Sequence, residues 1–391
     1  MVTTLPHAEW LKREDLAALI EALGPGQARY VGGAVRDTLL GLAVKDIDIA
    51  TPLEPAEVTQ RLKAAGITVV PTGIDHGTVT AVLKNGPVEI TTLRHDVSTD
   101  GRRATVAFAR DWQDDAARRD FTINALYADP ATLEVYDYFG GLDDLAARRL
   151  RFIGDARQRI REDHLRILRY FRFQARFGSQ PPDLEAEESC SELAATLKGL
   201  SRERIGMEMM NLLGLPNPAP TIARMDQLGV LPVVLPEAQV PVLEALVQHE
   251  QEESAGPDPL RRLAALLPAS APLAEQVASR FRLSGAQKKR LALAAARGEE
   301  READARALAY RLGRDAALDR LLLAGASAAL LHDWDIPTLP LKGGDIVARG
   351  VKAGPEVARI LRAVETRWVD ESFPDADRVR ELLDLELATA P

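Results

Sequence analysis

The sequence predicts an α+β, multi-domain protein, with a small mixed-sheet head followed by an elongated all-α remainder. Strand and turn signals lie before residue 145, including alternating runs at 78–83 and 88–93 joined by Asn85-Gly86, a hairpin signal. After that point the apolar residues recur at helical spacing, and glycine and proline mark the breaks. A chain of 391 residues is also too long for one ordinary core.

The elements of the head follow from local periodicity and from glycine stops. In order, we expect a helix over 8–23, a strand over 28–31, a helix ending at Leu40, a strand over 44–50, a helix over 57–65, and strands over 67–70, 78–83 and 88–93. The all-α remainder is interrupted most clearly at 214–220, which reads G-L-P-N-P-A-P. We therefore expect three domains, namely the head (1–145), a helical neck (146–214) and a helical body and tail (215–391).

Composition excludes several classes of protein. Hydrophobic residues make up 46% and charged residues 27%, as in soluble globular proteins, and no apolar run is long enough to predict a membrane span. The first ten residues carry no signal-peptide pattern. Cys190 is the single cysteine, so we expect neither an internal disulfide nor a cysteine-based zinc site, and a reducing cytoplasm fits best. The net charge of −9 argues against a general polyanion binder, so any nucleic-acid contact depends on local basic clusters.

The stretch 30–51 carries the first functional signal. Gly32 and Gly33 lie between a short strand and a helix, where a glycine turn brings backbone N–H groups close to an anion. Asp46 and Asp48 are two residues apart on the next strand, so both carboxylates project from one face. Adjacent like charges repel, and a divalent cation relieves this. A phosphate cradle and a metal-binding pair in one βαβ-like unit predict chemistry on a nucleoside triphosphate.

Two further head residues fit the same chemistry. Glu89 lies mid-strand between two apolar residues and is the best candidate for the third carboxylate of a two-metal nucleotidyl transfer site. Arg36 lies on the first turn of the helix after the glycines, where a guanidinium can pair with phosphate oxygens. An isolated D-x-D is more often a solvated strand edge, but the preceding G-G-A-V-R-D favours the functional interpretation.

A second cluster, R-R-D-F-T-I-N-A, spans 118–125. A helix N-terminus that carries Arg118 and Arg119 would suit a triphosphate, and Asp120 or Asn124 would reach a ribose hydroxyl. The alternative is that Asp120 is an N-cap and that the arginines face solvent. Taken alone, the cluster leaves both interpretations open.

The segment 162–177 predicts a strongly one-sided helix. Asp163, Arg166, Arg169, Arg172 and Arg176 recur at spacings of three or four residues, whereas apolar side chains occupy the other half. A solvated basic face is the ordinary interpretation. An acid one turn before an arginine instead combines an acceptor with a donor fork, as reading the Watson–Crick edge of a base requires.

Taken together, these motifs resemble one known family. Y-V-G-G-A-V-R-D-x-L-L-G, K-D-I-D-I-A-T, R-R-D-F-T-I-N-A, Y-F-G-G-L-D-D-L and E-D-H-L-R-I-L-R-Y-F-R-F occur in this order. They look like the class II tRNA nucleotidyltransferases, the CCA-adding enzymes of the polymerase-β-like superfamily. The likeness is continuous over about residues 28–210 and looser beyond 215, and S-R-E-R-I-G-M-E (201–208) resembles the motif that braces the neck.

The resemblance implies a role for each matched residue. In the head, Gly33 and Arg36 would bind the triphosphate, Asp46 and Asp48 would hold Mg²⁺, and Glu89 would be the third carboxylate. Further along the chain, the matched nucleotide-binding residues are Arg119 at the phosphates, Asp120 near the ribose, Asp163 and Arg166 at the base, and Arg169 and Arg172 around the pocket. Protein side chains would thus replace a nucleic-acid template.

The implied activity is template-independent addition of C, C and A to the 3′ end of tRNA, from CTP and ATP, by two-metal nucleotidyl transfer. The helical remainder would hold the acceptor stem and T arm. A mobile loop at 94–110 would permit the switch from C to A, which its glycine and polar content fit.

Three alternatives stay open. The chain resembles full CCA-adding enzymes, but CC-adding and A-adding enzymes of the same family share its motifs. Bacterial poly(A) polymerases share the head, although the segment 69–82, V-V-P-T-G-I-D-H-G-T-V-T-A-V, looks like the tRNA enzymes. A non-catalytic RNA-binding protein on a transferase-like head is the third, and the presence of Asp46, Asp48 and Arg119 speaks against it.

Overall fold

The computed structural model describes most of the chain in two compact units. The described residues are 3–73, 77–100, 103–109, 111–179, 181–298 and 300–388, with the backbone alone at 95–100, 103–107 and 302. The first unit comprises Met1–Glu208 with Thr221–Pro236, and the second comprises Met209–Pro220 with Glu237–Pro391. The three-domain division expected from the sequence stays a prediction, and each unit is described by itself.

A seven-stranded mixed sheet forms the centre of the first unit, as the sequence predicts. Its order is β3-β4-β5-β2-β1-β8-β9. The strands are β1 (Arg29–Val31), β2 (Asp48–Thr51), β3 (Thr68–Gly73), β4 (Thr78–Leu83), β5 (Gly86–Thr92), β8 (Leu126–Ala128) and β9 (Val135–Asp137). Among these, β2 and β5 pair in parallel and the other neighbours pair antiparallel.

The expected βαβ-like unit is wrong in one respect. β1 and β2 flank helix α2 (Gly33–Leu39), but they pair antiparallel, with Val31 opposite Asp48, and the parallel partner of β2 is β5. The chain turns after α2 at Gly41, whose φ of +67° is accessible to glycine at little cost. It then returns in the direction opposite to β1.

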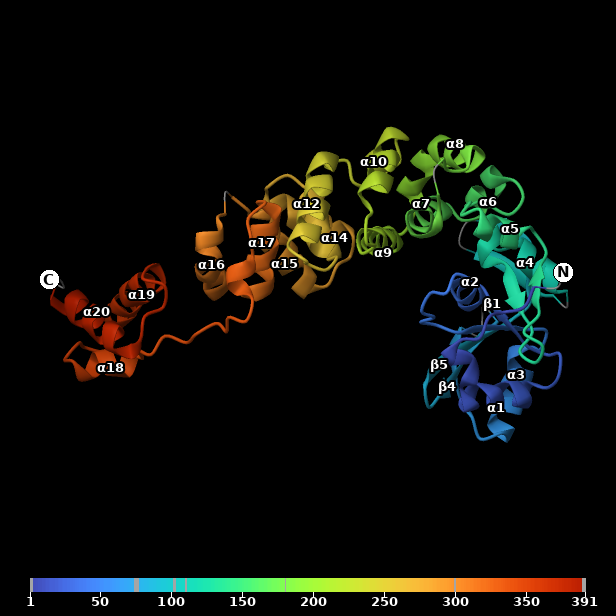
Figure 1. Cartoon of the computed structure of the whole chain (residues 1–391), viewed down its shortest axis with the longest axis horizontal. Helices are drawn as coiled ribbons and strands as arrows, with labels where there is room; N and C mark the ends of the chain where they lie inside the picture. The colour runs from blue at the N-terminus through green and yellow to red at the C-terminus, as the bar shows by residue number, and fades with distance from the viewer. Residues whose placement is uncertain are drawn as a thin grey trace. The chain divides into compact units, whose positions relative to one another are not determined.

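The two faces of the sheet carry different helices. Helix α1 (Glu14–Leu23) buries Leu16, Leu19 and Leu23, and packs beside α3 (Pro55–Ala64) (Figure 1). On the other face Val31 and Tyr127 join a buried cluster that includes residues of α4 (Trp112–Ala117). Because strand side chains alternate between faces, this second face is also that of Asp48, which pairs with Val31.

The segment expected to be a mobile loop at 94–110 forms a two-stranded hairpin instead. β6 (Arg94–Asp100) pairs antiparallel with β7 (Arg103–Phe108), from Arg94 opposite Phe108 to Asp100 opposite Arg103. The run R-A-T-V-A-F in β7 contains β-branched and aromatic residues, which favour a strand. The expectation of a loop considered only the glycine and polar residues of the segment. Residues 101, 102 and 110 lie outside the described residues.

The remainder of the chain is helical, as predicted. The first unit continues with α5 (Gly141–Ala146), α6 (Ala156–Glu162), α7 (Arg166–Phe177), α8 (Leu184–Glu192), α9 (Arg202–Leu213), α10 (Ala219–Gln227) and α11 (Leu231–Val234), α9 and α10 crossing the division between units. The second unit contains α12 (Val240–Glu252), α13 (Pro259–Leu266), α14 (Ala271–Arg280), α15 (Gly285–Ala295), α16 (Ala305–Leu312), α17 (Arg314–Leu323), α18 (Gly343–Ala348), α19 (Pro355–Asp370) and α20 (Ala376–Ala388). None of the helices that the structure describes is long and apolar enough to cross a membrane.

Candidate active site

The predicted carboxylates lie on one face of the sheet. Asp48 begins β2 and is paired in register with Glu89 of the parallel strand β5. Paired residues of neighbouring strands project from the same face, so the two carboxylates are neighbours there. Asp46 precedes β2 by two residues, with buried Ile47 between it and Asp48, and its side chain is exposed. Asp48 and Glu89 are therefore brought together, and Asp46 lies close enough to act on the Asp48 carboxylate.

The pKa of Asp48 reports this crowding. Burial raises the pKa, the Glu89 and Asp46 carboxylates raise it further, and the Arg119 guanidinium opposes them. A carboxylate whose ionisation is disfavoured by anionic neighbours is a place where a bound cation is stabilised. Arg119, predicted from a separate motif, is thus close enough to act on the same carboxylate.

The donor set fits Mg²⁺. All three groups are hard oxygen donors, as this ion prefers. Among the described residues, no three His, Cys, Asp or Glu side chains are arranged closely enough to enclose a metal ion by themselves. Mg²⁺ is commonly held by one or two carboxylates, with substrate phosphates and water as the remaining ligands, so an open acidic face is compatible with it.

The glycine turn lies directly beside Arg119. Gly32 has a φ of +66°, and its N–H donates to the Leu126 carbonyl at 3.1 Å. A Cβ at this position would lie 3.4 Å from Nη1 of Arg119. Gly33 then begins α2, so the turn leaves backbone, rather than side chain, facing the guanidinium. An anion that reaches Arg119 here can approach the main chain closely.

Arg118 and Arg119 do not begin a helix, which corrects that expectation. α4 ends at Ala117, Arg118 is its C-cap, and Asp111 caps its N-terminus by accepting from the Gln113 N–H. The competing interpretation of Asp120 as an N-cap is also wrong, because Phe121 precedes the short 3₁₀ helix Thr122–Asn124. The arginines follow a helix C-terminus, so no helix dipole assists them in holding an anion.

Arg36 is buried rather than open to solvent, with 5% of its surface exposed. Its Nε donates to Asp37 Oδ1 at 2.7 Å and its Nη1 donates to Asn124 Oδ1 at 2.5 Å. The guanidinium also lies 4.2 Å from the ring centroid of Phe177 in α7. Burial lowers its pKa, and Asp37 counteracts that effect. Arg36 thus joins the head to α7, and its predicted contact with phosphate stays a prediction.

Asp120 is the buried centre of a second group. Its Oδ1 accepts from Asn124 Nδ2 at 3.0 Å, and its Oδ2 accepts from Nε and Nη2 of Arg169 at 2.9 and 2.6 Å. Burial alone would raise the pKa of Asp120, but Arg169 and Asn124 together lower it to about 2. The carboxylate is therefore ionised and already paired, and it fixes Arg169 of α7.

Arg172 is held in a similar way. Its Nε donates to Oε2 of the buried Glu208 at 2.6 Å, and Glu208 also lies 3.7 Å from Nη1 of Arg169. Arg176 in turn donates to Asp37 Oδ2 at 3.2 Å. The predicted arginine face of α7 therefore exists, and acids at positions 37, 120 and 208 pair with it.

Asp163 does not lie on the same helix as Arg166, which corrects the one-helix expectation. Asp163 has extended backbone and ends α6, and α7 begins at Arg166. Its carboxylate accepts from Leu165 N at 3.2 Å and from Arg204 Nη2 at 2.7 Å. An aspartate that binds a backbone N–H two residues on favours a turn over a helix interior.

Both terminal nitrogens of the Arg166 guanidinium donate hydrogen bonds. Nη1 donates to Glu162 Oε2 at 2.7 Å and to the Arg159 carbonyl at 2.8 Å, and Nη2 donates to the Arg118 carbonyl at 3.0 Å. The last bond connects α7 to the motif that contains Arg119. Asp163 and Arg166 are thus neighbours along the chain, each with its own partners in this structure.

Several site residues were missed in the sequence. Asp115 and Tyr127 hold Arg119, and Asp37 and Glu208 pair with the arginines of α7. The spacing of Asp115 to Arg118 and Arg119, three and four residues on a helix, was a usable signal. Glu208 ends the S-R-E-R-I-G-M-E motif, but nothing in the sequence indicates its pairing with Arg172, which lies 36 residues away.

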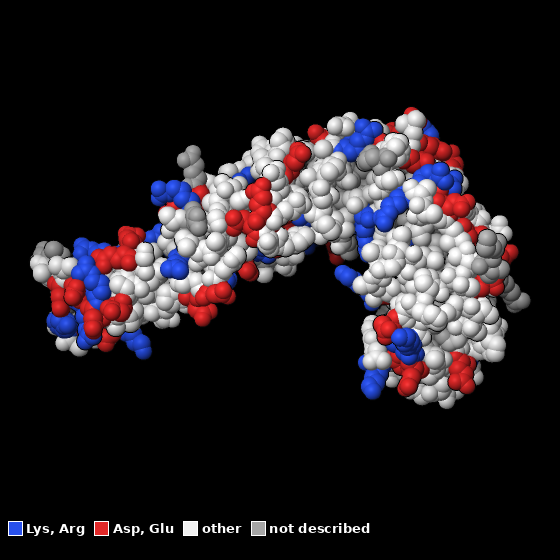
Figure 2. Space-filling view, viewed as in Figure 1, with Lys and Arg blue, Asp and Glu red and all other residues white. Residues whose placement is uncertain are grey.

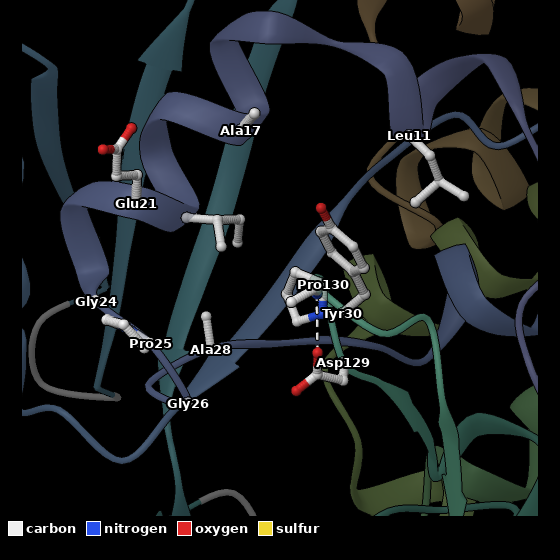
Figure 3. A pocket seen from close by; sticks show the side chains of 12 residues that line it. Leu11, Ala17, Glu21, Gly24, Pro25, Gly26, Ala28, Tyr30, Asp129 and Pro130 are labelled. Atoms are coloured by element: carbon white, nitrogen blue, oxygen red, sulfur yellow. Dashed lines mark hydrogen bonds between the residues drawn. The ribbon is translucent and has the colours of Figure 1, made fainter.

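A separate cavity of about 390 Å³ lies on the other face of the sheet (Figure 3). Leu11 and Ala17 lie on its helical side, and Tyr30 and Pro130 also line it. Tyr30 is paired with Ile49 rather than with Asp48, so its side chain projects away from the carboxylates. None of the predicted site residues lines this cavity.

Basic and acidic side chains are intermixed on the face shown in Figure 2, most clearly where α19 and α20 lie. There Arg359 pairs with Glu356 and Glu386, and Arg378 pairs with Glu371 and Glu381. Such exposed pairs add little stability. They break the basic surface of these two helices into small patches, in line with the net charge of −9.

Comparison with known proteins agrees with this geometry. The family model "Poly A polymerase head domain" matches residues 28–151, and the model "Probable RNA and SrmB- binding site of polymerase A" matches residues 182–240. The mouse protein named CCA tRNA nucleotidyltransferase 1, mitochondrial, is 35% identical over 397 residues, covering 94% of this chain and 89% of the relative.

Bacterial relatives agree over a shorter stretch. The CCA-adding enzyme of Streptococcus pyogenes is 44% identical over 218 residues, which is 55% of this chain and 52% of that enzyme. The crystal structure of the Bacillus stearothermophilus CCA-adding enzyme in complex with CTP superposes with a TM-score of 0.72 at 25% identity, covering 96% of this chain and 98% of that chain. The chain therefore belongs to the family of CCA-adding enzymes, the CCA tRNA nucleotidyltransferases.

Proposed function

We propose that this chain adds C, C and A to the 3′ end of tRNA from CTP and ATP without a nucleic-acid template. The supporting observation is the acidic face formed by Asp48 and Glu89 in register, with Arg119 acting on the same carboxylate. Such a face suits a triphosphate that carries a cation and meets a guanidinium. Family membership names the reaction, because the relatives are named for CCA addition.

Asp46, Asp48 and Glu89 would hold the divalent ions. Bound Mg²⁺ would supply activation of the tRNA 3′-hydroxyl and neutralisation of charge on the triphosphate and the leaving diphosphate. The chain's own contribution is position, because Asp48 and Glu89 are fixed by the pairing of β2 with β5. A site on strands of a rigid sheet keeps the attacking and leaving oxygens in line better than a loop does.

Arg119 is proposed to contact the triphosphate, since its charge acts on Asp48 and its Nη1 lies beside the Gly32 turn. Arg36 acts behind it, by fixing Asn124 and by packing under Phe177. Asp120 orients Arg169, and Glu208 orients Arg172, toward the nucleotide pocket. Gly33 offers a main-chain N–H at the start of α2.

Base selection is proposed to rest with Asp163 and Arg166. One offers acceptors and the other donors, which together match the edge of C or A. In this structure their partners are Arg204, Glu162 and main-chain carbonyls. We therefore expect nucleotide binding to exchange at least one of these bonds for a bond to the base.

The tRNA is the proposed partner, held at its 3′ end by the head and neck and along its acceptor stem and T arm by the helical body and tail. The cytoplasmic compartment stays a prediction, and the mouse relative is named as mitochondrial.

The test uses the purified full chain, tRNA lacking its terminal C-C-A, and CTP and ATP supplied separately and together, followed by sequencing of the RNA 3′ ends. Ends that read C-C-A support the proposal. Addition of C-C alone or A alone would assign the chain to the corresponding partial activity, and a run of A would assign poly(A) synthesis. No metal-dependent incorporation at all would leave only the RNA-binding interpretation.

A further inference from the structure

Asp115 is a buried carboxylate beside the site, and its charge has no place in the proposed reaction. It lies in α4, with 1% of its surface exposed. Its Oδ2 accepts from Tyr127 Oη at 2.7 Å and from Arg119 Nη2 at 3.2 Å. Its Oδ1 accepts from Arg118 Nε at 2.9 Å. Burial alone would raise its pKa, but Arg119, Arg118 and Tyr127 lower it to about 2, so it is fully ionised at neutral pH.

Tyr127 completes the support of Arg119. It lies on β8 in register with Val31, and therefore on the face of the sheet that carries Asp48. Its hydroxyl donates to Asp115 and accepts from Arg119 Nε at 3.1 Å. One carboxylate and one phenol thus fix both the Nε and the Nη2 edge of the same guanidinium. The third bond, Nη1 to the Asn124 carbonyl, is longer at 3.5 Å.

The orientation that these bonds impose directs the Arg119 guanidinium toward the glycine turn and the carboxylates. Its remaining surface faces Gly32, whose missing side chain leaves the Nη1 side open, and its charge acts on Asp48. An arginine side chain that is free to rotate loses conformational entropy on binding a phosphate, whereas one held in place does not. A buried, ionised partner is a strong way to hold it.

The same carboxylate reaches a second element. Asp115 Oδ1 accepts from the backbone N–H of Arg94 at 3.2 Å, where the hairpin β6–β7 begins. The base of the hairpin and the guanidinium of Arg119 are therefore tied to one buried group. A displacement of the hairpin base or of the Arg119 guanidinium would therefore change a hydrogen bond to Asp115.

We propose that Asp115, with Tyr127, is a positioning residue that pre-orients Arg119 for the nucleotide triphosphate. The inference rests on the proposed contact between Arg119 and the triphosphate. Asp115 is assigned no contact of its own with substrate or metal, and its proposed effect on nucleotide binding passes through Arg119.

The test is a double-mutant cycle on the full chain, with the dissociation constants of ATP and CTP measured by equilibrium binding in the presence of Mg²⁺. Asp115→Asn keeps the shape and removes the charge, and it is expected to weaken nucleotide binding about tenfold, which is the effect of one charge-assisted hydrogen bond. In the Arg119→Ala background the same substitution is expected to have no further effect. Affinity for tRNA is expected to stay unchanged.

A second variant and a control distinguish the loss of this contact from a general loss of stability. Tyr127→Phe removes the hydroxyl alone, and it is also expected to weaken nucleotide binding. In the Arg119→Ala background it is expected to have no further effect on nucleotide binding. Glu187→Gln is the matched control, because Glu187 is a buried carboxylate paired with Arg224 in the same unit and far along the chain from the site.

The outcomes separate this inference from the proposed function. Should Arg119→Ala leave nucleotide affinity unchanged, the proposed triphosphate contact is wrong. Should Arg119→Ala weaken binding while Asp115→Asn and Tyr127→Phe do not, or should their effects add fully to it, the positioning role alone is overturned.

Discussion

Asp120→Asn should destabilise the first unit by breaking its pairing with Arg169. Asp120 is 8% exposed, and its Oδ2 accepts two hydrogen bonds from the Arg169 guanidinium. Asparagine keeps the size of the side chain and removes the charge. Arg169 would then retain Glu208, at 3.7 Å, as its acidic neighbour.

The magnitude follows from the pKa of Asp120. The folded chain lowers it from 3.8 to about 2, so the ionised form stabilises the fold above the unfolded pKa. A shift of nearly two units corresponds to about 2 kcal/mol at neutral pH. Because the folded pKa is the lower one, this contribution is lost as the pH falls toward 2, and about half of it remains at pH 3.

Urea unfolding at pH 7 and pH 3 measures this effect. Trp334→Phe and Trp368→Phe in the background leave Trp10 and Trp112, both in the first unit, as the fluorescent reporters. Asp163→Asn is the control, because Asp163 also pairs with an arginine but is 30% exposed, and it should cost less than about 1 kcal/mol. Equal losses of unfolding free energy for the two variants, or a loss for Asp120→Asn that is as large at pH 3 as at pH 7, would show that the Asp120–Arg169 pair does not stabilise the fold in this way.

Three further substitutions test other parts of the account. Glu89→Gln should lower kcat for both nucleotides by roughly 100-fold, because Glu89 lies in register with Asp48 on the acidic face; a kcat near that of the wild type would contradict its role as the third carboxylate. Arg166→Ala should disturb the choice between CTP and ATP more than folding, and unchanged rate and selectivity would remove its proposed role. Gly141→Ala should destabilise the first unit by about 2 kcal/mol or more, because its Cβ would lie 2.3 Å from the Thr122 carbonyl; thermal unfolding at the wild-type midpoint would contradict that packing.

Local periodicity was enough to predict the acidic face of the sheet. Asp48 and Glu89 are flanked by apolar residues that alternate with them. Such alternation depends only on neighbouring residues and directly gives the face of the strand on which each side chain lies. The mixed sheet and the all-α remainder follow from the same kind of signal. The direction of pairing did not, because whether β2 runs parallel to β1 depends on the turn at Gly41 and on competition from β5.

Two of the wrong predictions concern helix boundaries. Arg118 and Arg119 were expected to begin a helix, but the preceding residues already form α4, capped by Asp111. Asp163 was placed on a helix by its spacing to Arg166, yet its carboxylate binds the Leu165 N–H and ends α6 instead. In both cases an aspartate that bonds to nearby backbone decided the boundary, which spacing alone does not show.

The acidic partners of the α7 arginines could not be predicted from neighbouring residues in the sequence. Arg169 meets Asp120 from 49 residues away, and Arg176 meets Asp37 from 139 residues away. A sequence shows that a helix is basic on one side. It does not show that acids from the head and from α9 lie against that side, because those contacts exist only after the elements pack.

The most direct test of the central claim compares the wild-type chain with Asp48→Asn on tRNA lacking its terminal C-C-A, with CTP, ATP and Mg²⁺ present. The measurement is the sequence of the RNA 3′ ends with the chain in excess over tRNA and time for three additions, with tRNA affinity measured in parallel. We expect C-C-A ends for the wild type, and unextended ends with unchanged tRNA affinity for the variant. C-C-A ends produced by Asp48→Asn at a rate near that of the wild type would contradict this expectation.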